Sequence, residues 1–203
     1  MTRLLVSIVL CLGLAASASA QDQEPTKPST VATADFKVTL PKGWTGQALK
    51  TPNGPAVQAT HQATGCNVLV STTPSPAAED VKGIATLKQR PGLVALSFIM
   101  PMAKNAMQKS EAAGGSVVDL IHFDTMQLAG KPAGAARITL LAIKEGQKVG
   151  SAVLHAGAIQ SGQRLIFGVV VTRYVGPGPH DQVAFHKAIL EAYGILRGVE
   201  PLQ

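Results

Sequence analysis

Five histidines and two cysteines are the residues of this chain that could bind a metal ion or take part in catalysis. His61 and Cys66 lie five residues apart on either side of a predicted turn, so they could meet across a hairpin. Zinc sites take three or four nitrogen, sulfur or oxygen ligands, and no second close pair follows in the sequence. We therefore predict no metal site.

The other histidines have spacings that do not suit a shared ligand. His180 and His186 would point to nearly opposite sides of a helix, so they cannot bind one ion. His122 and His155 lie in predicted strands and would be neighbours only if the chain pairs those strands. We interpret both as hydrogen-bonded or solvated strand residues.

The motifs of the common enzyme classes are missing. The chain has neither a Gly-x-Ser-x-Gly elbow nor a His-Glu-x-x-His sequence. Its glycine-rich turns at 130–132 and 176–179 contain prolines where a phosphate loop needs backbone donors. Cys66 lies in an apolar stretch, where burial makes a thiol unreactive. We predict no catalytic residues, no enzymatic activity and no cofactor.

Three methionines form the one candidate binding surface. Met100, Met102 and Met107 fall in a segment with helical spacing of apolar residues, where Met100 and Met107 share a face and Met102 points away. Clustered thioethers can hold Cu(I), but flexible apolar packing is the more common use of methionine. We predict an apolar contact surface that adapts to a partner segment.

Residues 1–20 have the pattern of a secretory signal peptide. A positively charged start at Arg3 is followed by an apolar run and by the small residues Ala18-Ser19-Ala20. This order predicts cleavage between Ala20 and Gln21 and export to the periplasm or the outside. The apolar run is shorter than the roughly 20 residues that cross a bilayer, so we expect no membrane span in the mature chain.

Cysteine usage fits an exported protein that is not lipid-anchored. Cys11 follows Leu10, whereas the residue before a lipidated cysteine is normally small. Cleavage after Ala20 would leave Cys66 as the one thiol, which cannot form an internal disulfide.

The charge distribution argues against nucleic acid as a partner. The chain has 18 lysines and arginines against 12 acidic residues, a net charge of +6, but its basic residues are scattered. Aromatic residues make up 4% of the chain, so few rings are available to stack on bases.

Hydrophobic periodicity predicts one folded domain, residues 35–203, after a flexible polar leader at 21–34. Alternating or continuous apolar runs predict strands at 35–40, 56–61, 66–72, 117–128, 135–143, 149–159 and 164–172. Helices are expected from Ser75, over 93–111 and after Asp181, with Pro101 kinking or dividing the second one.

The last predicted strand is apolar on both faces over 165–171, which is typical of a central strand covered on both sides. The predicted fold class is therefore α+β, with a mostly antiparallel β-sheet and helices on both faces.

Residues 36–44, FKVTLPKGW, resemble the opening motif of PsbP-like domains: a strand, Leu-Pro, a small spacer and Gly-Trp. This superfamily includes the extrinsic photosystem PsbP subunit, the eukaryotic Mog proteins and the bacterial DcrB-type envelope proteins. The resemblance extends from Asp35 to about Gly198 and implies an α/β/α sandwich. It also implies a non-enzymatic role, since members are mostly binding, chaperone or assembly factors. The matching positions are expected to be folding determinants: Phe36, Leu40, Pro41, Gly43 and Trp44.

We therefore predict an exported, non-catalytic binding, chaperone or assembly-factor protein of the cell envelope. Its partner, an unknown envelope protein or component, would occupy an apolar groove between the sheet and segment 93–107. The alternative is a periplasmic protein that binds a small molecule or a metal ion through His61, Cys66 and nearby polar groups.

Overall fold

Two antiparallel sheets and two helices make up the part of the chain that our computed structural model describes, residues 27–52, 54–74, 91–111, 116–162, 164–175 and 182–202. The helices are α2 (Pro91–Glu111) and α3 (Gln182–Arg197). The strands are β1 (Ser29–Ala32), β2 (Phe36–Leu40), β3 (Trp44–Thr51), β4 (Gly54–His61), β5 (Asn67–Pro74), β6 (Ser116–Leu128), β7 (Lys131–Lys144), β8 (Gln147–Ser161), β9 (Arg164–Val175) and β10 (Glu200–Pro201).

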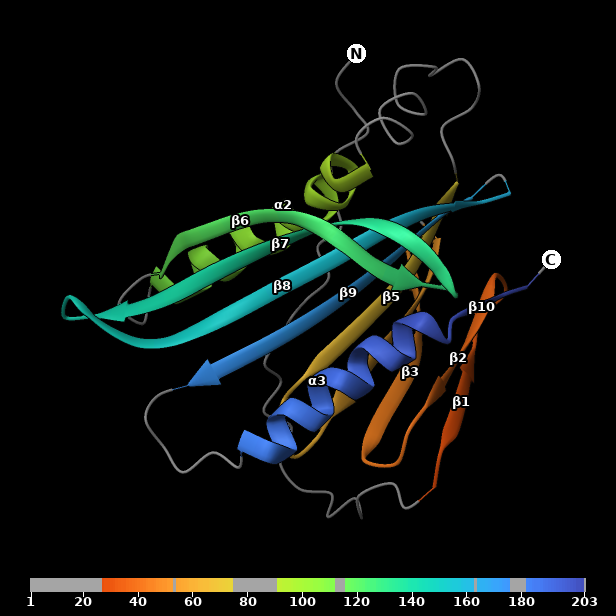
Figure 1. The fold of residues 1–203 in the computed structure, drawn as a ribbon, viewed down its shortest axis with the longest axis horizontal. Coiled ribbons are helices and arrows are strands. Elements are labelled where there is room, and N and C mark those ends of the chain that lie inside the picture. The colour runs from red at the N-terminus through yellow and green to blue at the C-terminus, as the bar shows by residue number, and fades with distance from the viewer. Residues whose placement is uncertain are drawn as a thin grey trace.

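The main sheet has seven strands in the order β3-β4-β5-β9-β8-β7-β6, and every neighbouring pair is antiparallel. Its long strands β6 to β9 form a continuous meander (Figure 1). A smaller sheet, β1-β2-β10, lies beside the β3 end.

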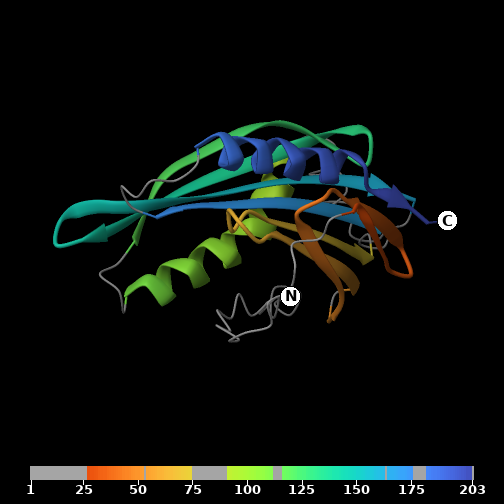
Figure 2. The same cartoon turned by 90° about the horizontal axis from the view of Figure 1, so that it is seen from below.

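The two helices cover opposite faces of the main sheet (Figure 2). Each face has its own buried core: Ile99 and Ala103 of α2 pack on one side, and Ala192 and Leu196 of α3 pack on the other. This arrangement confirms the predicted α+β fold with a mostly antiparallel sheet and helices on both faces.

β9 is the central strand, as its apolar sequence predicted. Side chains of β9 alternate between the two cores: Ile166 and Val170 contact the α3 side, while Phe167, Val169 and Val171 contact the α2 side. A strand that is buried on both faces has no position for polar side chains, which explains its continuous apolar run.

Helix α2 is continuous through Pro101, so of the two predicted effects of this proline, a kink or a division of the helix, the division is wrong. Pro91 occupies the first helical position, where its fixed φ and missing N–H are tolerated. Contacts with the sheet hold both halves in place: Ala95 and Ile99 are buried before the proline, and Ala103 is buried after it. Phe98 also stacks on Phe167 of β9, with ring centroids 4.3 Å apart. Tertiary packing thus outweighs the local cost of the proline.

Folded structure begins before Asp35, where the predicted leader was expected to end. Strand β1 pairs with β2 from Ser29↔Leu40 to Ala32↔Lys37, and Val31 packs against the core. The polar composition of residues 29–32 did not predict a strand. The strand forms because β2, which follows it in the chain, supplies its hydrogen-bonding partner. Strand β3 was also missed, since its exposed Gly46, Gln47 and Ala48 give it no apolar alternation.

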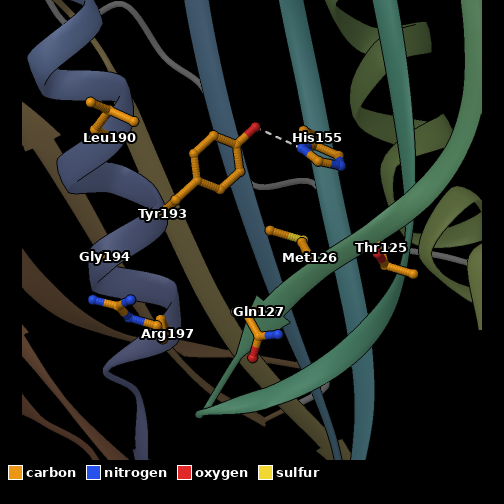
Figure 3. Close-up of a pocket in the computed structure, with 8 residues that line it drawn as sticks. All are labelled: Thr125, Met126, Gln127, His155, Leu190, Tyr193, Gly194 and Arg197. Carbon is orange, nitrogen blue, oxygen red and sulfur yellow. Dashed lines mark hydrogen bonds between the residues drawn. The ribbon is translucent and has the colours of Figure 1, made fainter.

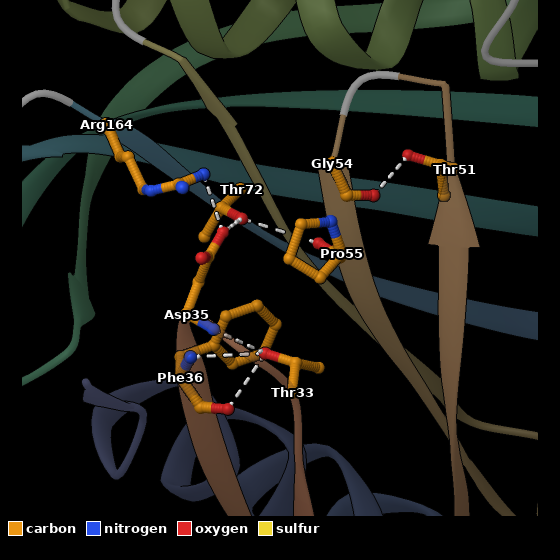
Figure 4. Close-up of polar contacts among 8 residues, drawn as sticks. All are labelled: Thr33, Asp35, Phe36, Thr51, Gly54, Pro55, Thr72 and Arg164. Atoms are coloured by element: carbon orange, nitrogen blue, oxygen red, sulfur yellow. Dashed lines mark hydrogen bonds and ion pairs between the residues drawn. The ribbon is translucent and has the colours of Figure 1, made fainter.

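Asp35 ties this N-terminal segment to the main sheet (Figure 4). Its side chain is 8% exposed, and its Oδ2 accepts a hydrogen bond from Thr72 Oγ1 at 2.6 Å and pairs with Arg164 at 2.7 Å. Thr33 Oγ1 accepts from the backbone N–H groups of Asp35 and Phe36. A buried carboxylate needs such partners to offset its lost hydration.

Several predicted features lie outside the described residues: the signal peptide and its processing site at Ala20 and Gln21, the helix from Ser75, and His180. Within the described ranges, no helix is long and apolar enough to span a membrane.

Candidate functional site

A pocket opens on the α3 side of the main sheet, between α3 and β6 (Figure 3). Its volume is about 460 Å³, and small-molecule sites usually occupy about 300–1,000 Å³. We call it the α3 pocket. It is lined by Thr125, Met126 and Gln127 from β6, His155 from β8, and Leu190, Tyr193, Gly194 and Arg197 from α3.

A chain of three hydrogen-bonded side chains ends at this pocket. His155 Nε2 lies 2.8 Å from Asp124 Oδ1, and His155 Nδ1 lies 2.6 Å from the Tyr193 hydroxyl. The His155 side chain is 8% exposed and that of Asp124 is 29% exposed. Two members of this chain, His155 and Tyr193, line the pocket, and the Tyr193 hydroxyl points toward His155 (Figure 3).

Strand register explains why these groups converge. His155 pairs across the sheet with Arg137, and Arg137 pairs with His122, so all three lie in one row on the α3 face. Asp124, two residues after His122, points to the same face. His122 and His155 are therefore not direct neighbours, because β7 separates their strands.

The cross-strand pair Gly157 and Gly168 makes room beside the pocket. A Cβ on Gly157 would lie 2.5 Å from the sulfur of Met126, and a Cβ on Gly168 would lie 2.8 Å from Leu128. The two glycines thus let the end of β6 pack closely over β8 and β9, which places Met126 in the pocket wall.

Two arginines give the pocket region a positive character. Arg197 lines the pocket, and the charge of Arg137 lies close enough to act on Tyr193. Burial raises the pKa of the Tyr193 hydroxyl, and the Arg137 charge opposes part of that increase. Neither arginine has an ion-pair partner among the described side chains.

The outer edge of β6 is the second candidate surface. β6 is a terminal strand of the main sheet and pairs only with β7 in the described part of the chain. Five of its large apolar side chains are 39–50% exposed: Val117, Val118, Leu120, Ile121 and Phe123. We call these residues the β6 edge. Exposed apolar clusters and unpaired strand edges are both typical of protein contact surfaces.

The three predicted methionines do not share one accessible face. Met100 is 41% exposed, Met102 is 7% exposed and packs against the sheet, and Met107 is half-buried beside the same core. An open groove was expected between the sheet and segment 93–107. At Met102 this space is filled by packed side chains. Binding at this helix stays a prediction, and Met100 is the residue at which an added charge would test it.

His61 and Cys66 flank the β4–β5 turn as expected, but they are joined through the backbone: the His61 N–H donates to the Cys66 carbonyl at 2.8 Å. Cys66 is fully buried, and this burial raises the pKa of its thiol to about 12. Among the described residues, no group of three or more His, Cys, Asp or Glu side chains could hold a metal ion.

Sequence reasoning named His155 but none of its partners. One signal was available: Leu190, Gly194 and Arg197 recur at helical spacing beside the buried face of α3, which places them along one exposed stripe. Nothing local indicates which strand this stripe would face.

No protein-family model matches the sequence, and no curated protein sequence matches it. Among solved structures, the fold is similar to that of the cyanobacterial PsbP protein CyanoP from Synechocystis sp. PCC 6803, with a TM-score of 0.50 and 14% identity. That match covers 92% of this chain and 99% of CyanoP. CalU16 from Micromonospora echinospora matches 76% of this chain and 83% of its own length with 11% identity and a TM-score of 0.20.

The likeness to CyanoP confirms the fold that the FKVTLPKGW motif suggested. Phe36, Leu40 and Trp44 of this motif are fully buried, and Trp44 Nε1 donates a hydrogen bond to Glu191 Oε2 of α3 at 2.9 Å. The motif therefore packs β2 of the small sheet and the start of β3 into the same core as α3, and the chain has a PsbP-like fold.

Proposed function

We propose that this chain is an exported, non-catalytic binding domain of the cell envelope that holds a partner protein at the β6 edge. The signal-peptide pattern of residues 1–20 supports export, and the PsbP-like fold agrees with a binding or assembly role. The observation that carries the proposal is the cluster of exposed apolar side chains at the start of β6, on both faces of this terminal strand.

The two edges of the main sheet differ in how they are protected. At the β3 edge, Gly46 lies against Leu40 and Val31 of the small sheet, and Lys50 adds a charge. β6 contains no lysine, arginine or proline, which are the residues that usually block strand addition. A bulge interrupts β6 between Val118 and Leu120, and the regular run Leu120–Leu128 after it is long enough to pair with an added strand.

The occupant that fits this edge is an extended segment of a partner protein with alternating apolar side chains and basic residues. β6 has two acidic residues. Asp119 is exposed, and Asp124 contacts His155. A second copy of β6 would bring the same acidic residues into the interface, whereas a partner with lysine or arginine would complement them.

Site-specific photo-crosslinking in the native host tests this proposal. A crosslinking amino acid at Leu120 or Phe123 should give a covalent adduct with one discrete partner protein, and the same group at Gln47 of β3 should not. Equal adducts from both edges, or none from β6, would contradict the proposal. An adduct between two copies of this chain would instead assign the edge to self-association.

Small-molecule binding is the second candidate function, because the α3 pocket has a suitable volume and a buried polar group beside apolar walls. This candidate uses His155 rather than the predicted pair His61 and Cys66. It uses a different part of β6, since residues 125–127 line the α3 pocket and the β6 edge lies at residues 117–123.

A further inference from the structure

The α3 pocket follows the edge of β6 rather than one of its faces. Three consecutive residues of β6 line it, Thr125, Met126 and Gln127. Successive side chains of a strand point to opposite faces, so three in a row can line one pocket only where the pocket follows the strand edge. β7 pairs with the other edge of β6, and none of its residues is among those that line the pocket. The pocket therefore lies at the unpaired edge of β6, with α3 on its other side (Figure 3).

A strand added to β6 would pass directly along this pocket. The regular pairing of β6 with β7 continues from Leu120 to Leu128, so the β6 edge and the pocket residues belong to one uninterrupted strand. An extended segment of about eight residues spans roughly 26 Å. Such a segment could contact the β6 edge with one half and lie between β6 and α3 with the other.

Gly194 keeps the α3 wall of the pocket open. It lies inside α3, where glycine is less favourable than alanine. A Cβ built on Gly194 would meet no described atom within 4 Å, and its φ is not in the left-handed region. Neither packing against the described chain nor backbone conformation thus requires a glycine here. Room for an occupant of the pocket accounts for it.

The walls of the pocket suit an apolar side chain. Met126, Leu190 and the ring of Tyr193 contribute apolar surface. The polar groups are already engaged with each other: His155 is bonded at both ring nitrogens, to Asp124 and to the Tyr193 hydroxyl. Aromatic rings and the methionine sulfur pack well against another large apolar or aromatic side chain. The volume of about 460 Å³ is sufficient for one such side chain.

Charged residues mark the two ends of this path. Asp119 is exposed just before the regular run of β6. Arg197 lines the pocket at the other end, where its backbone carbonyl accepts the N–H of Gly130 in the β6–β7 turn at 2.8 Å. Neither charge has an ion-pair partner among the described side chains. A segment with a basic residue toward Asp119 and an acidic residue toward Arg197 would complement both.

We propose that the α3 pocket is the specificity pocket for the strand that a partner protein adds to β6. The partner segment is extended, inserts one large apolar or aromatic side chain between β6 and α3, and carries a basic residue toward Asp119 and an acidic one toward Arg197. Main-chain hydrogen bonds along an added strand give affinity, and a side-chain pocket beside the strand selects the sequence. This inference rests on the proposed function, partner binding at the β6 edge.

Photo-crosslinking in the native host from both sides of the path tests the proposal. A crosslinking amino acid at Leu190, across the pocket from β6, should give an adduct with the same partner protein as the one at Leu120. Mass spectrometry should place the two adducts on one partner segment, about 5–7 residues apart, with a large apolar residue at the Leu190 adduct. The same group at Lys187, which pairs with Glu191 and does not line the pocket, should give no adduct.

Variants of Gly194 separate occupation of the pocket from folding. Gly194→Leu fills the pocket and should reduce the Leu120 adduct at least tenfold, whereas Gly194→Ala adds one methyl group and should retain most of it. Both variants should melt at or above the wild-type temperature, since each removes a glycine from a helix. Lys187→Leu adds the same side chain to α3 outside the pocket and should leave the adduct unchanged.

The two proposals fail in distinguishable ways. A Leu120 adduct that persists in Gly194→Leu would overturn this inference and leave partner binding at the β6 edge intact. A Leu190 adduct with a different partner, or with a segment that has no large apolar side chain, would do the same. Loss of the Leu120 adduct in the wild type would overturn both proposals.

Discussion

Burial has opposite consequences for Cys66 and His155, two buried side chains of types that often take part in binding or catalysis. Within the described ranges Cys66 has no charged partner that would stabilise a thiolate, so desolvation raises its pKa to about 12 and makes it inert. His155 has a partner at each ring nitrogen, so it is fully hydrogen-bonded although it is buried. A buried residue therefore remains usable for function when its partners connect it to the surface.

The raised thiol pKa predicts a loss of stability in alkaline solution. In the unfolded chain Cys66 ionises near its ordinary value of 9.0, whereas in the folded protein it stays protonated up to about pH 12. Between these values the unfolded state has lost a proton that the folded state keeps, so the free energy of unfolding falls by up to about 1.4 kcal/mol per pH unit.

Urea unfolding of the wild type and of Cys66→Ala at about pH 8 and about pH 10.5 measures this effect. The variant should lose less stability between the two pH values, because it lacks the thiol. Tyr193 ionisation acts in the same direction in both proteins, since its pKa is also raised by burial. An equal loss in both proteins would contradict the assignment to Cys66.

At the scale of elements, α2 illustrates how packing overrides local propensity. Pro101 removes a backbone hydrogen bond from the middle of a 21-residue helix, yet the helix continues because Ile99, Met102 and Ala103 are buried against the sheet. Apolar burial on one face thus compensates for a defect on the exposed face.

Pro101→Ala should therefore stabilise the protein. Alanine restores the missing backbone hydrogen bond at an exposed position. It should raise the free energy of unfolding by about 1–3 kcal/mol, because the greater flexibility of the unfolded chain offsets only part of the gain. Chemical denaturation with an unchanged m-value would measure it. Unchanged or lower stability would mean that the proline fits its site without strain.

At the scale of the whole molecule, the two faces and the two edges of the main sheet have different exposure. Each face carries a helix, and the β3 edge lies near the small sheet, while no described strand pairs with the outer side of β6, where Phe123 alone of the β6 edge is known to lie against Gly92 of α2. An uncovered apolar edge favours either partner binding or aggregation.

Ile121→Lys should weaken partner capture at the β6 edge without unfolding the domain. Ile121 is 43% exposed, so a lysine can reach solvent while its charge opposes strand addition. We expect the crosslinked adduct from Leu120 to fall at least tenfold, with a melting temperature within a few degrees of the wild type. Gln47→Lys on the β3 edge is the matched control and should leave the adduct unchanged.

Local periodicity was sufficient to predict most of the fold. Seven of the strands and α2 and α3 follow apolar patterns that burial on one or both faces imposes, and the central position of β9 was readable from its apolar residues alone. The strands β1, β3 and β10 were missed because they are mostly exposed, so hydrogen bonding to a neighbour stabilises them more than side-chain burial does.

By itself, the sequence determined the fold class and the buried positions, because apolar spacing is a property of each segment. Only the tertiary structure decided where the polar groups meet: Tyr193 lies 38 residues after His155 and Asp124 lies 31 residues before it, on three separate elements. Strand register and the packing of α3 bring these three side chains together. Register and packing depend on contacts between distant segments, which no local pattern encodes.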